Sequence, residues 1–468
     1  MKFLSRSLNI VVWAVVICCT SSLYAVQKSA VTAKEHAVSM IQEGLNCLIL
    51  EQNKKAEEYF IRAKSLDPYS EQAYNFLGLL YMQEDLNEKA EDMLKKAVAI
   101  EPMYPEALRN LGKLYLRQDK FAQAAFYLRK TLNLDNNQPY TWYLLGMSLY
   151  FSGSIEEAIK AYEKAFAMEP NLPVEAYYNL GVALHENSQY LNAVKAYEEV
   201  IKQDPKHINA YNNLGLVYSV LGERAKAVRL FNDVLKIDPQ NVKARINLGN
   251  VYLSTQDLVE AEKIYRSAIS LDTKDISPRL NLGVVYYKQG DFVKAKTEWE
   301  KLLADNPNNV RVLSVIGSAY LEQRNYDKAI EIFKQISEVV PDNGSIANTL
   351  GYLLAEQNVE LELAEKLIEK AIKLDKVNRA TYYDSLAWVY YRQGKYDKAY
   401  EILDRALKIF RLSHSPVSTD VHYHMGKLRE LKKDFELAKE SYRLAIKSNT
   451  DKEIVRLASE SLHLIENR

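Results

Sequence analysis

A small residue recurs about every 34 residues along most of this 468-residue chain. Nine of the eleven steps in the series span 34 or 35 residues, and the last two span 36 and 39. The members are Gly44, Gly78, Gly112, Gly146, Gly181, Gly215, Gly249, Gly283, Gly317, Gly351, Ala387 and Gly426. An alanine follows each member after twelve or thirteen positions. A repeat of this length, rich in helix-forming residues, predicts a solenoid of stacked helical hairpins.

Each repeat has the apolar spacing of two amphipathic helices. In residues 208–241, Leu214 and Val217 share one helical face, and Phe231 and Val234 share another. A glycine within a helix costs about 1 kcal/mol relative to alanine. We therefore expect the recurring glycine and alanine to offset this cost by letting the two helices of a hairpin pack closely.

Four further glycines mark the expected turns inside hairpins, each seven residues after a member of the series: Gly153, Gly222, Gly290 and Gly394. The residue that follows a helix often adopts a left-handed backbone conformation, which glycine reaches without steric strain. Prolines, often in Asp-Pro pairs, mark the end of the second helix. Glycine and proline thus divide each repeat at its two connections.

The repeat resembles the tetratricopeptide repeat (TPR). A nearly complete copy of the TPR pattern is Tyr211, Leu214, Gly215, Tyr218, Ala227, Phe231, Val234 and Pro239. The resemblance covers residues 37–449 and implies an all-α fold, a right-handed superhelical solenoid of about twelve hairpins whose first helices line a concave groove. An apolar stripe in residues 450–468 predicts a helix that caps the last repeat.

Two repeats depart from the TPR pattern. The repeat of Gly351 has an extra residue in its internal turn, near residues 359–361. The first repeat has Glu43 and Cys47 where leucine and tyrosine are usual, as expected of an end repeat. We expect Cys47 to pack as a small apolar core residue.

Residues 1–25 resemble a secretory signal peptide. Lys2 and Arg6 precede an apolar run of ten residues, and cleavage is expected after Ala25. This predicts an exported protein, periplasmic or associated with the cell envelope, with residues 26–36 as a linker or the start of the first helix. The alternative is an uncleaved membrane anchor, although the run is short for a span of about 20 residues.

The sequence contains no recognisable catalytic arrangement. It has neither a glycine-rich phosphate loop nor a Cys-x-x-Cys pair. His422 and His424 lie two residues apart on a predicted helix, so they point to nearly opposite sides and cannot bind one metal ion. We expect the histidines on the surface, no enzyme activity, no metal and no cofactor. Because the chain has 61 basic and 61 acidic residues, we also expect no nucleic-acid binding.

A row of asparagines is the main candidate for partner binding. In five repeats an asparagine stands two residues before the glycine: Asn110, Asn179, Asn213, Asn247 and Asn281. Asn212 and Asn250 flank the row. A side-chain amide can donate to a peptide carbonyl and accept from a peptide N–H, so a regular row could hold an extended chain. The alternative is repeat filler, with each amide solvated or bonded to its neighbour.

Aromatic residues near this row are further candidates, because tyrosine and tryptophan are enriched at binding hot spots. We include Tyr143, Tyr178, Tyr287 and Trp388 among the partner-binding residues.

These observations predict a non-catalytic protein–protein interaction scaffold or adaptor of the bacterial cell envelope. It would bind an extended peptide or a partner protein in its concave groove, and associate with membrane-bound envelope complexes. One alternative is a component of an exporter that binds or guides a polysaccharide. Another is a regulatory TPR arm of a glycosyltransferase complex.

Overall fold

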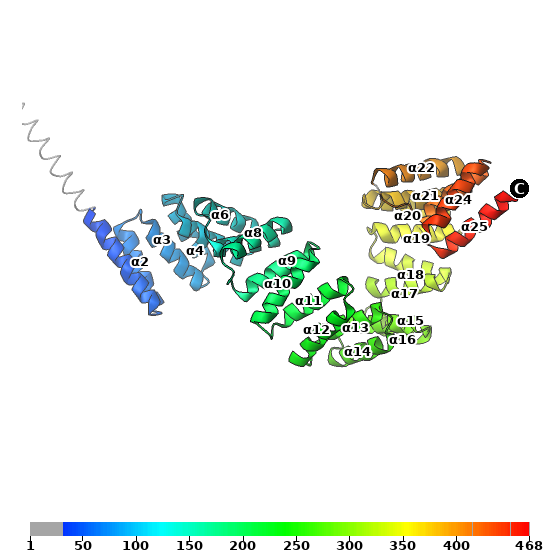
Figure 1. Cartoon of the computed structure of the whole chain (residues 1–468). Helices are drawn as coiled ribbons and strands as arrows, with labels where there is room; N and C mark the ends of the chain where they lie inside the picture. Colours follow the sequence, from blue (N-terminus) through cyan, green and yellow to red (C-terminus); the bar gives the residue numbers. More distant parts are fainter. Residues whose placement is uncertain (1–30, 414, 450, 468) are drawn as a thin grey trace, which may run out of the picture. The chain divides into compact units, whose positions relative to one another are not determined.

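The computed structural model describes residues 31–413, 415–449 and 451–467, and every regular element in these segments is a helix (Figure 1). The chain forms two compact units, with the boundary between Ala244 and Arg245. Each unit is described by itself. The predicted signal peptide lies outside the described residues. Among the residues described, no helix has the length and apolar character needed to span a bilayer.

In the N-terminal unit, the first helix described covers residues 31–49. Eleven helices follow: α2 (Asn53–Leu66), α3 (Glu71–Gln83), α4 (Asn87–Ile100), α5 (Pro105–Arg117), α6 (Phe121–Leu134), α7 (Pro139–Phe151), α8 (Ile155–Met168), α9 (Val174–Glu186), α10 (Tyr190–Gln203), α11 (Ile208–Val220) and α12 (Arg224–Ile237).

The C-terminal unit begins within α13 (Val242–Ser254). The helices after it are α14 (Leu258–Leu271), α15 (Ile276–Lys288), α16 (Phe292–Asp305), α17 (Val310–Glu322), α18 (Tyr326–Val339), α19 (Gly344–Glu356), α20 (Leu361–Leu374), α21 (Arg379–Arg392), α22 (Tyr396–Leu412), α23 (Thr419–Leu431), α24 (Phe435–Ser448) and α25 (Lys452–Glu466).

Helices pack in consecutive pairs, which confirms the predicted hairpins. In the N-terminal unit α3 packs on α4, α5 on α6 and α7 on α8, and the C-terminal unit continues the pattern from α15 with α16 to α23 with α24. We call the first helix of each pair the A helix and the second the B helix. Successive A helices also contact each other, as in α3 with α5 and α5 with α7. One side of each unit is therefore formed by neighbouring A helices.

Each glycine of the 34-residue series faces a large side chain of the B helix. An added Cβ at any of the eleven glycines would come within 3.0 Å of the side chain sixteen or seventeen residues later. In the hairpin of α11 and α12, Gly215 faces the ring of Phe231, and in that of α15 and α16, Gly283 faces Trp299. The close packing was predicted, but its nature differs from the expectation. The space beside glycine is filled mainly by a B-helix side chain, and the backbone oxygen of the following series alanine is also close at Gly78, Gly112 and Gly351.

The turn between the helices of a hairpin has a left-handed residue in every repeat. The four glycines predicted for this position have φ between 76° and 86°. Eight non-glycine residues occupy the same place with φ between 56° and 62°: Glu51, Asp85, Asp119, Ser188, Gln256, Arg324, Asn358 and Lys433. In the repeat with the extra residue, Glu360 is a second left-handed residue, with φ 45°. The turn geometry is therefore kept even where its preferred residue is missing.

The two ends of the repeat array have distinct features. Cys47 is buried, as expected, and it is the one cysteine among the described residues. At the other end α25 packs on α24 and also contacts α23, with Ala458, Ser461 and Ile465 buried. Glu453 of α25 forms an ion pair with Arg324, 3.1 Å away, which lies 129 residues earlier in the turn after α17. In the C-terminal unit, α25 therefore reaches back across several repeats.

Candidate binding surfaces

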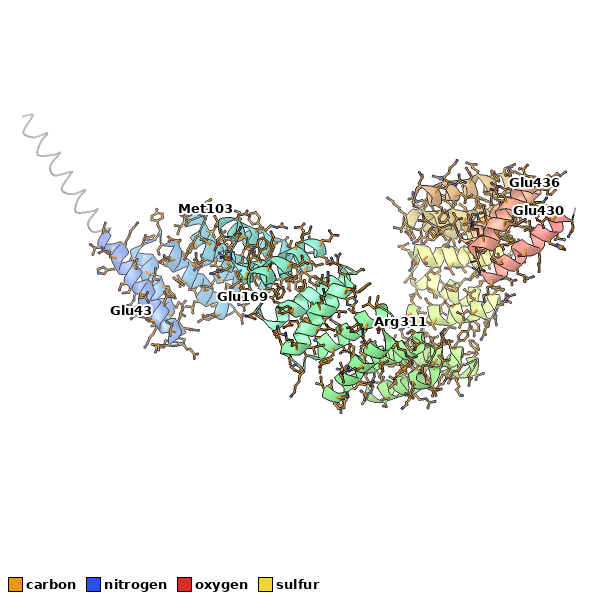
Figure 2. All side chains as sticks on the ribbon, in the orientation of Figure 1. Glu43, Met103, Glu169, Arg311, Glu430 and Glu436 are labelled. Carbon is orange, nitrogen blue, oxygen red and sulfur yellow. The ribbon has the colours of Figure 1, made fainter. Side chains whose placement is uncertain are left out.

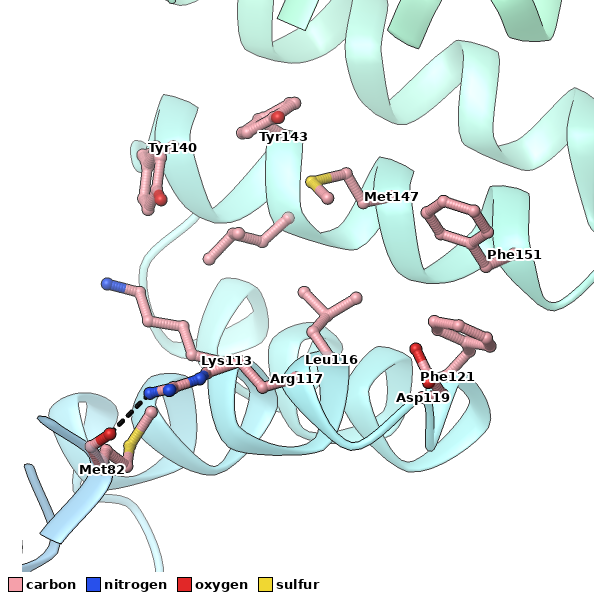
Figure 3. Close-up of a pocket in the computed structure, with 11 residues that line it drawn as sticks. Met82, Lys113, Leu116, Arg117, Asp119, Phe121, Tyr140, Tyr143, Met147 and Phe151 are labelled. Atoms are coloured by element: carbon pink, nitrogen blue, oxygen red, sulfur yellow. Dashed lines mark hydrogen bonds between the residues drawn. The ribbon is translucent and has the colours of Figure 1, made fainter. Parts of the chain in front are cut away.

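A hollow of about 540 Å³ lies between α5 and α7, with Met82 of α3 at one end (Figure 3). The rings of Phe121 and Phe151 stack with their centroids 5.0 Å apart. Lys113 Nζ lies 5.0 Å from the centroid of the Tyr140 ring. The remaining lining residues are Leu116, Arg117, Asp119, Tyr143, Leu144 and Met147. The lining is mostly apolar, with Lys113 and Arg117 as its cations.

A second hollow of about 530 Å³ adjoins the first, because Lys113 lines both. Its other lining residues come from the first helix, from α3, from Tyr104 just before α5 and from the first half of α5: Val38, Ile41, Gln42, Leu45, Gln72, Asn75, Phe76, Leu79, Tyr104, Glu106, Arg109 and Asn110. We call the two hollows together the N-terminal groove. It runs along the A helices of the first four repeats.

Asn110 lies in this groove but is nearly buried, with 4% of its surface exposed. Its Nδ2 donates a hydrogen bond of 2.9 Å to Oδ1 of Asn75, on the A helix of the preceding repeat. Asn75 Nδ2 and Asn110 Oδ1 make no hydrogen bond within the described residues, and neither atom is fully enclosed by protein. Asn75 is only 1% exposed, so protein covers almost all of the pair where it borders the hollow.

The other asparagines of the row in the N-terminal unit also bond to the preceding repeat. Asn179 Nδ2 donates to Tyr143 Oη at 3.2 Å. Asn213 Nδ2 donates to Tyr178 Oη at 3.1 Å and to Tyr197 Oη at 3.4 Å. These amides link neighbouring repeats, which is the alternative reading of the row. Binding of a peptide by the same residues stays a prediction.

In the C-terminal unit Asn281 follows the same pattern. Its Nδ2 donates to Asn250 Oδ1 at 2.9 Å and to Tyr265 Oη at 3.4 Å. Asn250 is exposed, and its Oδ1 also accepts from Tyr265 Oη at 2.6 Å. Asn247 is partly buried, and its Nδ2 is enclosed without a hydrogen-bond partner. The donors that were expected to face a ligand are thus largely used or covered.

Burial corrects the expectation that all the candidate side chains stand open to a partner. Asn212 is 2% exposed and its Oδ1 is enclosed without a partner, while Tyr143 is 7% exposed. Tyr178 is partly buried, and its ring packs 5.0 Å from that of His207. Tyr287 is also partly buried and lines a smaller hollow of about 260 Å³ between α15 and α17. Helical periodicity gave the correct helix for each residue, but it did not show how deeply the next repeat would cover them.

Trp388 is the clearest correction, because it belongs to the core of the C-terminal unit. Only 6% of its surface is exposed, and its ring stacks between those of Tyr391, 4.7 Å away, and His424, 4.1 Å away. Its Nε1 donates to Glu356 Oε2 at 2.8 Å. His424 is buried too, with Nδ1 2.8 Å from Asp384 Oδ1. The expectation that the histidines lie on the surface is therefore wrong for His424, whose polar ring is compensated by a buried carboxylate.

Sequence reasoning missed several residues of the N-terminal groove. Asn75, Arg109, Lys113 and Met147 line it, and none was a candidate. A signal was present, because Arg109, Lys113 and Arg117 recur every four residues on one predicted helix and so share a face. No group of histidine, cysteine or carboxylate side chains suited to a metal ion occurs among the described residues.

Comparison with protein families gives TPR matches over most of the chain. A model described as the TPR domain of cytochrome c-type biogenesis protein H matches residues 116–243. Three tetratricopeptide repeat models match residues 81–147, 221–279, 255–317 and 286–355, then 380–412, then 419–452. A comparison with curated proteins finds no significant match.

Several solved structures resemble the chain. YrrB, described as a TPR protein with an unusual peptide-binding site, is 22% identical over 40% of this chain and 95% of its own, with a TM-score of 0.38. Yeast Tom70 is 15% identical over 91% of this chain and 96% of its own, with a TM-score of 0.42. MamA from Desulfovibrio magneticus RS-1 is 25% identical over 36% of this chain and 97% of its own, with a TM-score of 0.35. With its repeat matches and helical hairpins, the chain belongs to the tetratricopeptide repeat family.

Proposed function

We propose that this protein is a non-catalytic adaptor of the bacterial cell envelope, which binds an extended peptide or a segment of a partner protein in the N-terminal groove. TPR domains generally mediate protein–protein interactions. The match to a TPR domain of a cytochrome c-type biogenesis protein supports a role in the assembly of other proteins.

The observation that carries this proposal is the open apolar lining of the groove. Phe151 is 54% exposed and Tyr140 is 45% exposed, although both are large aromatic residues. Exposed apolar surface of this kind, rimmed by polar side chains, is typical of interaction sites. The groove also lies along consecutive A helices, so a long segment can contact several repeats at once.

Quantitative affinity capture tests the proposal. The protein without residues 1–25 is used as bait on an extract of its own cells, and a Met147→Glu variant is compared with it. Met147 lines the hollow between α5 and α7, so a carboxylate there should repel an apolar segment and reduce recovery of the specific partner. Leu191→Glu is the matched control, because Leu191 is 70% exposed on α10 and lies outside the groove.

Equal recovery of every bound protein with the wild type and with Met147→Glu would contradict binding in this groove. Retention on a polysaccharide column that Met147→Glu abolishes, without any protein partner, would favour the glycan-guiding alternative instead.

Export is a separate part of the proposal. It is supported by the signal-like residues 1–25, and we propose cleavage after Ala25 with localisation to the periplasm or the envelope. Mass spectrometry of the protein from fractionated cells should then find Val26 as the first residue. An intact N-terminus in the cytoplasmic fraction would contradict export and favour a regulatory arm of a glycosyltransferase complex.

A further inference from the structure

We infer that the N-terminal groove selects peptides in which an acidic side chain stands next to a large apolar side chain. This inference rests on the proposed function and names the class of peptide. The acidic side chain pairs with Lys113, and the apolar side chain enters the hollow between α5 and α7.

The cationic stripe on α5 provides the first argument. Arg109, Lys113 and Arg117 follow one another at intervals of four residues, and all three line the groove. Arg117 is already engaged, since it pairs with Asp85 and donates to the carbonyl oxygen of Met82 at 2.6 Å. The positive charge available to a ligand is therefore centred on Arg109 and Lys113.

Lys113 has no acidic partner within 4.0 Å among the described residues. The groove has two carboxylates in its lining, Glu106 and Asp119, and neither forms an ion pair with Lys113 or Arg109. Burial, and then the charge of Arg109, lower the pKa of Lys113. Burial and the nearby second cation both disfavour the charge on Lys113, and a carboxylate from a ligand would neutralise it and accept its hydrogen bonds.

Lys113 also stands at the junction of the two hollows. Its Nζ approaches the face of the Tyr140 ring, so the stem and the ring together form a wall of the first hollow (Figure 3). Arg109 lies one turn earlier on α5, and its Nη1 reaches Gln138 Oε1 only at 3.4 Å. A carboxylate at this junction can therefore contact Lys113 and approach Arg109 from the same side.

The hollow beyond Lys113 accommodates an apolar side chain. Leu116, Met147 and Phe151 face it in Figure 3, with Phe121 stacked on Phe151. Its volume of about 540 Å³ exceeds that of one aromatic side chain. Methionine adapts its shape to different apolar groups, so the hollow is suited to aromatic and aliphatic side chains alike.

The asparagine pair on the other side of Lys113 is not accessible enough to bind a ligand. Asn75 is 1% exposed and Asn110 is 4% exposed, and the two amides share a hydrogen bond. Selectivity therefore comes from Lys113 and the apolar hollow.

A phage-displayed library of random heptapeptides tests the inference. It is selected on the protein without residues 1–25 and, in parallel, on its Lys113→Glu variant. We expect the wild type to enrich an aspartate or glutamate beside a large apolar residue. We expect the variant to enrich lysine or arginine at that position and keep the apolar residue, because the groove charge has been reversed. Lys160→Glu, an exposed position on α8, should select the same peptides as the wild type.

The best acidic peptide is then synthesised and titrated. Lys113→Ala should weaken its binding about tenfold. This loss lies between that of removing one partner of an exposed ion pair and that of removing one partner of a fully buried pair. Circular dichroism of each variant should match the wild type, so that a loss of binding is not a loss of fold.

Two outcomes would overturn the inference in different ways. In the first outcome, the peptides selected by the wild type lack an acidic residue, or Lys113→Glu selects the same acidic peptides. If Met147→Glu still abolishes binding in that case, the groove binds peptides but the acidic preference is wrong. If no peptide is enriched by the wild type over Met147→Glu, peptide binding in the groove fails together with the preference.

Discussion

The ring of Phe231 occupies the place where Gly215 would carry a side chain. A Cβ added to Gly215 would lie 2.7 Å from Phe231 Cε1, and Phe231 itself is completely buried. Ten other repeats have the same relationship between a glycine and a large side chain. The twelfth replaces glycine with Ala387, and the residue sixteen positions later is the buried Leu403. Leucine also faces glycine at Gly78 and Gly112, so a B-helix leucine can either fill or leave free the space of one methyl group, depending on how it packs.

Gly215→Ala should destabilise the protein by about 1–3 kcal/mol, the usual cost of overpacking a core, and Gly215→Leu by more. Phe231→Leu should relieve part of that cost in the Gly215→Ala protein, because leucine is smaller than phenylalanine and can turn away from the added methyl group, as Leu403 does opposite Ala387. Urea denaturation of the two single variants and the double variant measures the coupling. Strictly additive free energies of unfolding would show that the two side chains do not compete for one space.

Much of this fold could be predicted from the sequence, because repetition makes local patterns reliable. The hairpins and the left-handed turns at Gly153 and Gly222 follow from spacing alone. The candidate site was harder, since the surroundings of an A-helix residue depend on the neighbouring repeat. Asn213 bonds to Tyr178, 35 residues earlier, and Trp388 is covered by His424, 36 residues later. Whether such a residue faces a partner or its own neighbour depends on this packing, which periodicity does not specify.

The left-handed turns offer a stabilising change. Ser188 has φ 59° at the position where Gly222 has φ 77° in the next repeat. A left-handed conformation costs a non-glycine residue about 1–2 kcal/mol, and replacement by glycine removes this cost. Part of the gain in stability is lost, because glycine is more flexible than serine in the unfolded chain. Ser188→Gly should therefore stabilise the protein by about 0.5–1 kcal/mol in thermal or urea denaturation.

Gly222→Ala is the matched control for the turn. A Cβ at Gly222 would have no neighbour within 4 Å, so its effect reports backbone conformation alone. It should destabilise by about 1 kcal/mol. If both variants changed stability in the same direction, the conformational argument would be wrong.

The hydrogen bond between Asn213 and Tyr178 should orient the Asn213 amide and also contribute to the free energy of unfolding. Asn213→Ala removes hydrogen bonds to Tyr178 and Tyr197, and a net loss of about 1 kcal/mol is expected for such bonds. Tyr178→Phe should cost less, because Asn213 retains its bond to Tyr197. The double variant should be less destabilised than the sum of the two, since both changes delete one shared bond. Asn209→Ala, exposed on the same helix, serves as the control and should change stability little.

The buried pair of His424 and Asp384 should make the stability of the C-terminal unit depend on pH. Burial alone lowers the pKa of His424, but the charge and hydrogen bond of Asp384, with smaller effects of Asp420 and Glu356, raise it overall above 6.5. Because the pKa is higher in the folded state, the stabilising contribution is fully present below the unfolded pKa of about 6.5 and is lost as pH rises through the folded pKa. Burial also raises the pKa of Asp420. This shift likewise makes the protein less stable as pH rises, but the loss of stability begins at a lower pH than that from His424.

His424→Gln isolates this contribution, because glutamine can still bond to Asp384 but cannot become charged. The difference in unfolding free energy between wild type and variant should be largest near about pH 6 and shrink towards about pH 9. Urea denaturation followed by tryptophan fluorescence measures it, since Trp388 stacks on the His424 ring. His463→Gln, at an exposed position on α25, should show no comparable trend. A His424 difference that stays constant or grows with rising pH would mean that the pair is not ionised in the folded protein, and that His424 acts only by packing against Trp388.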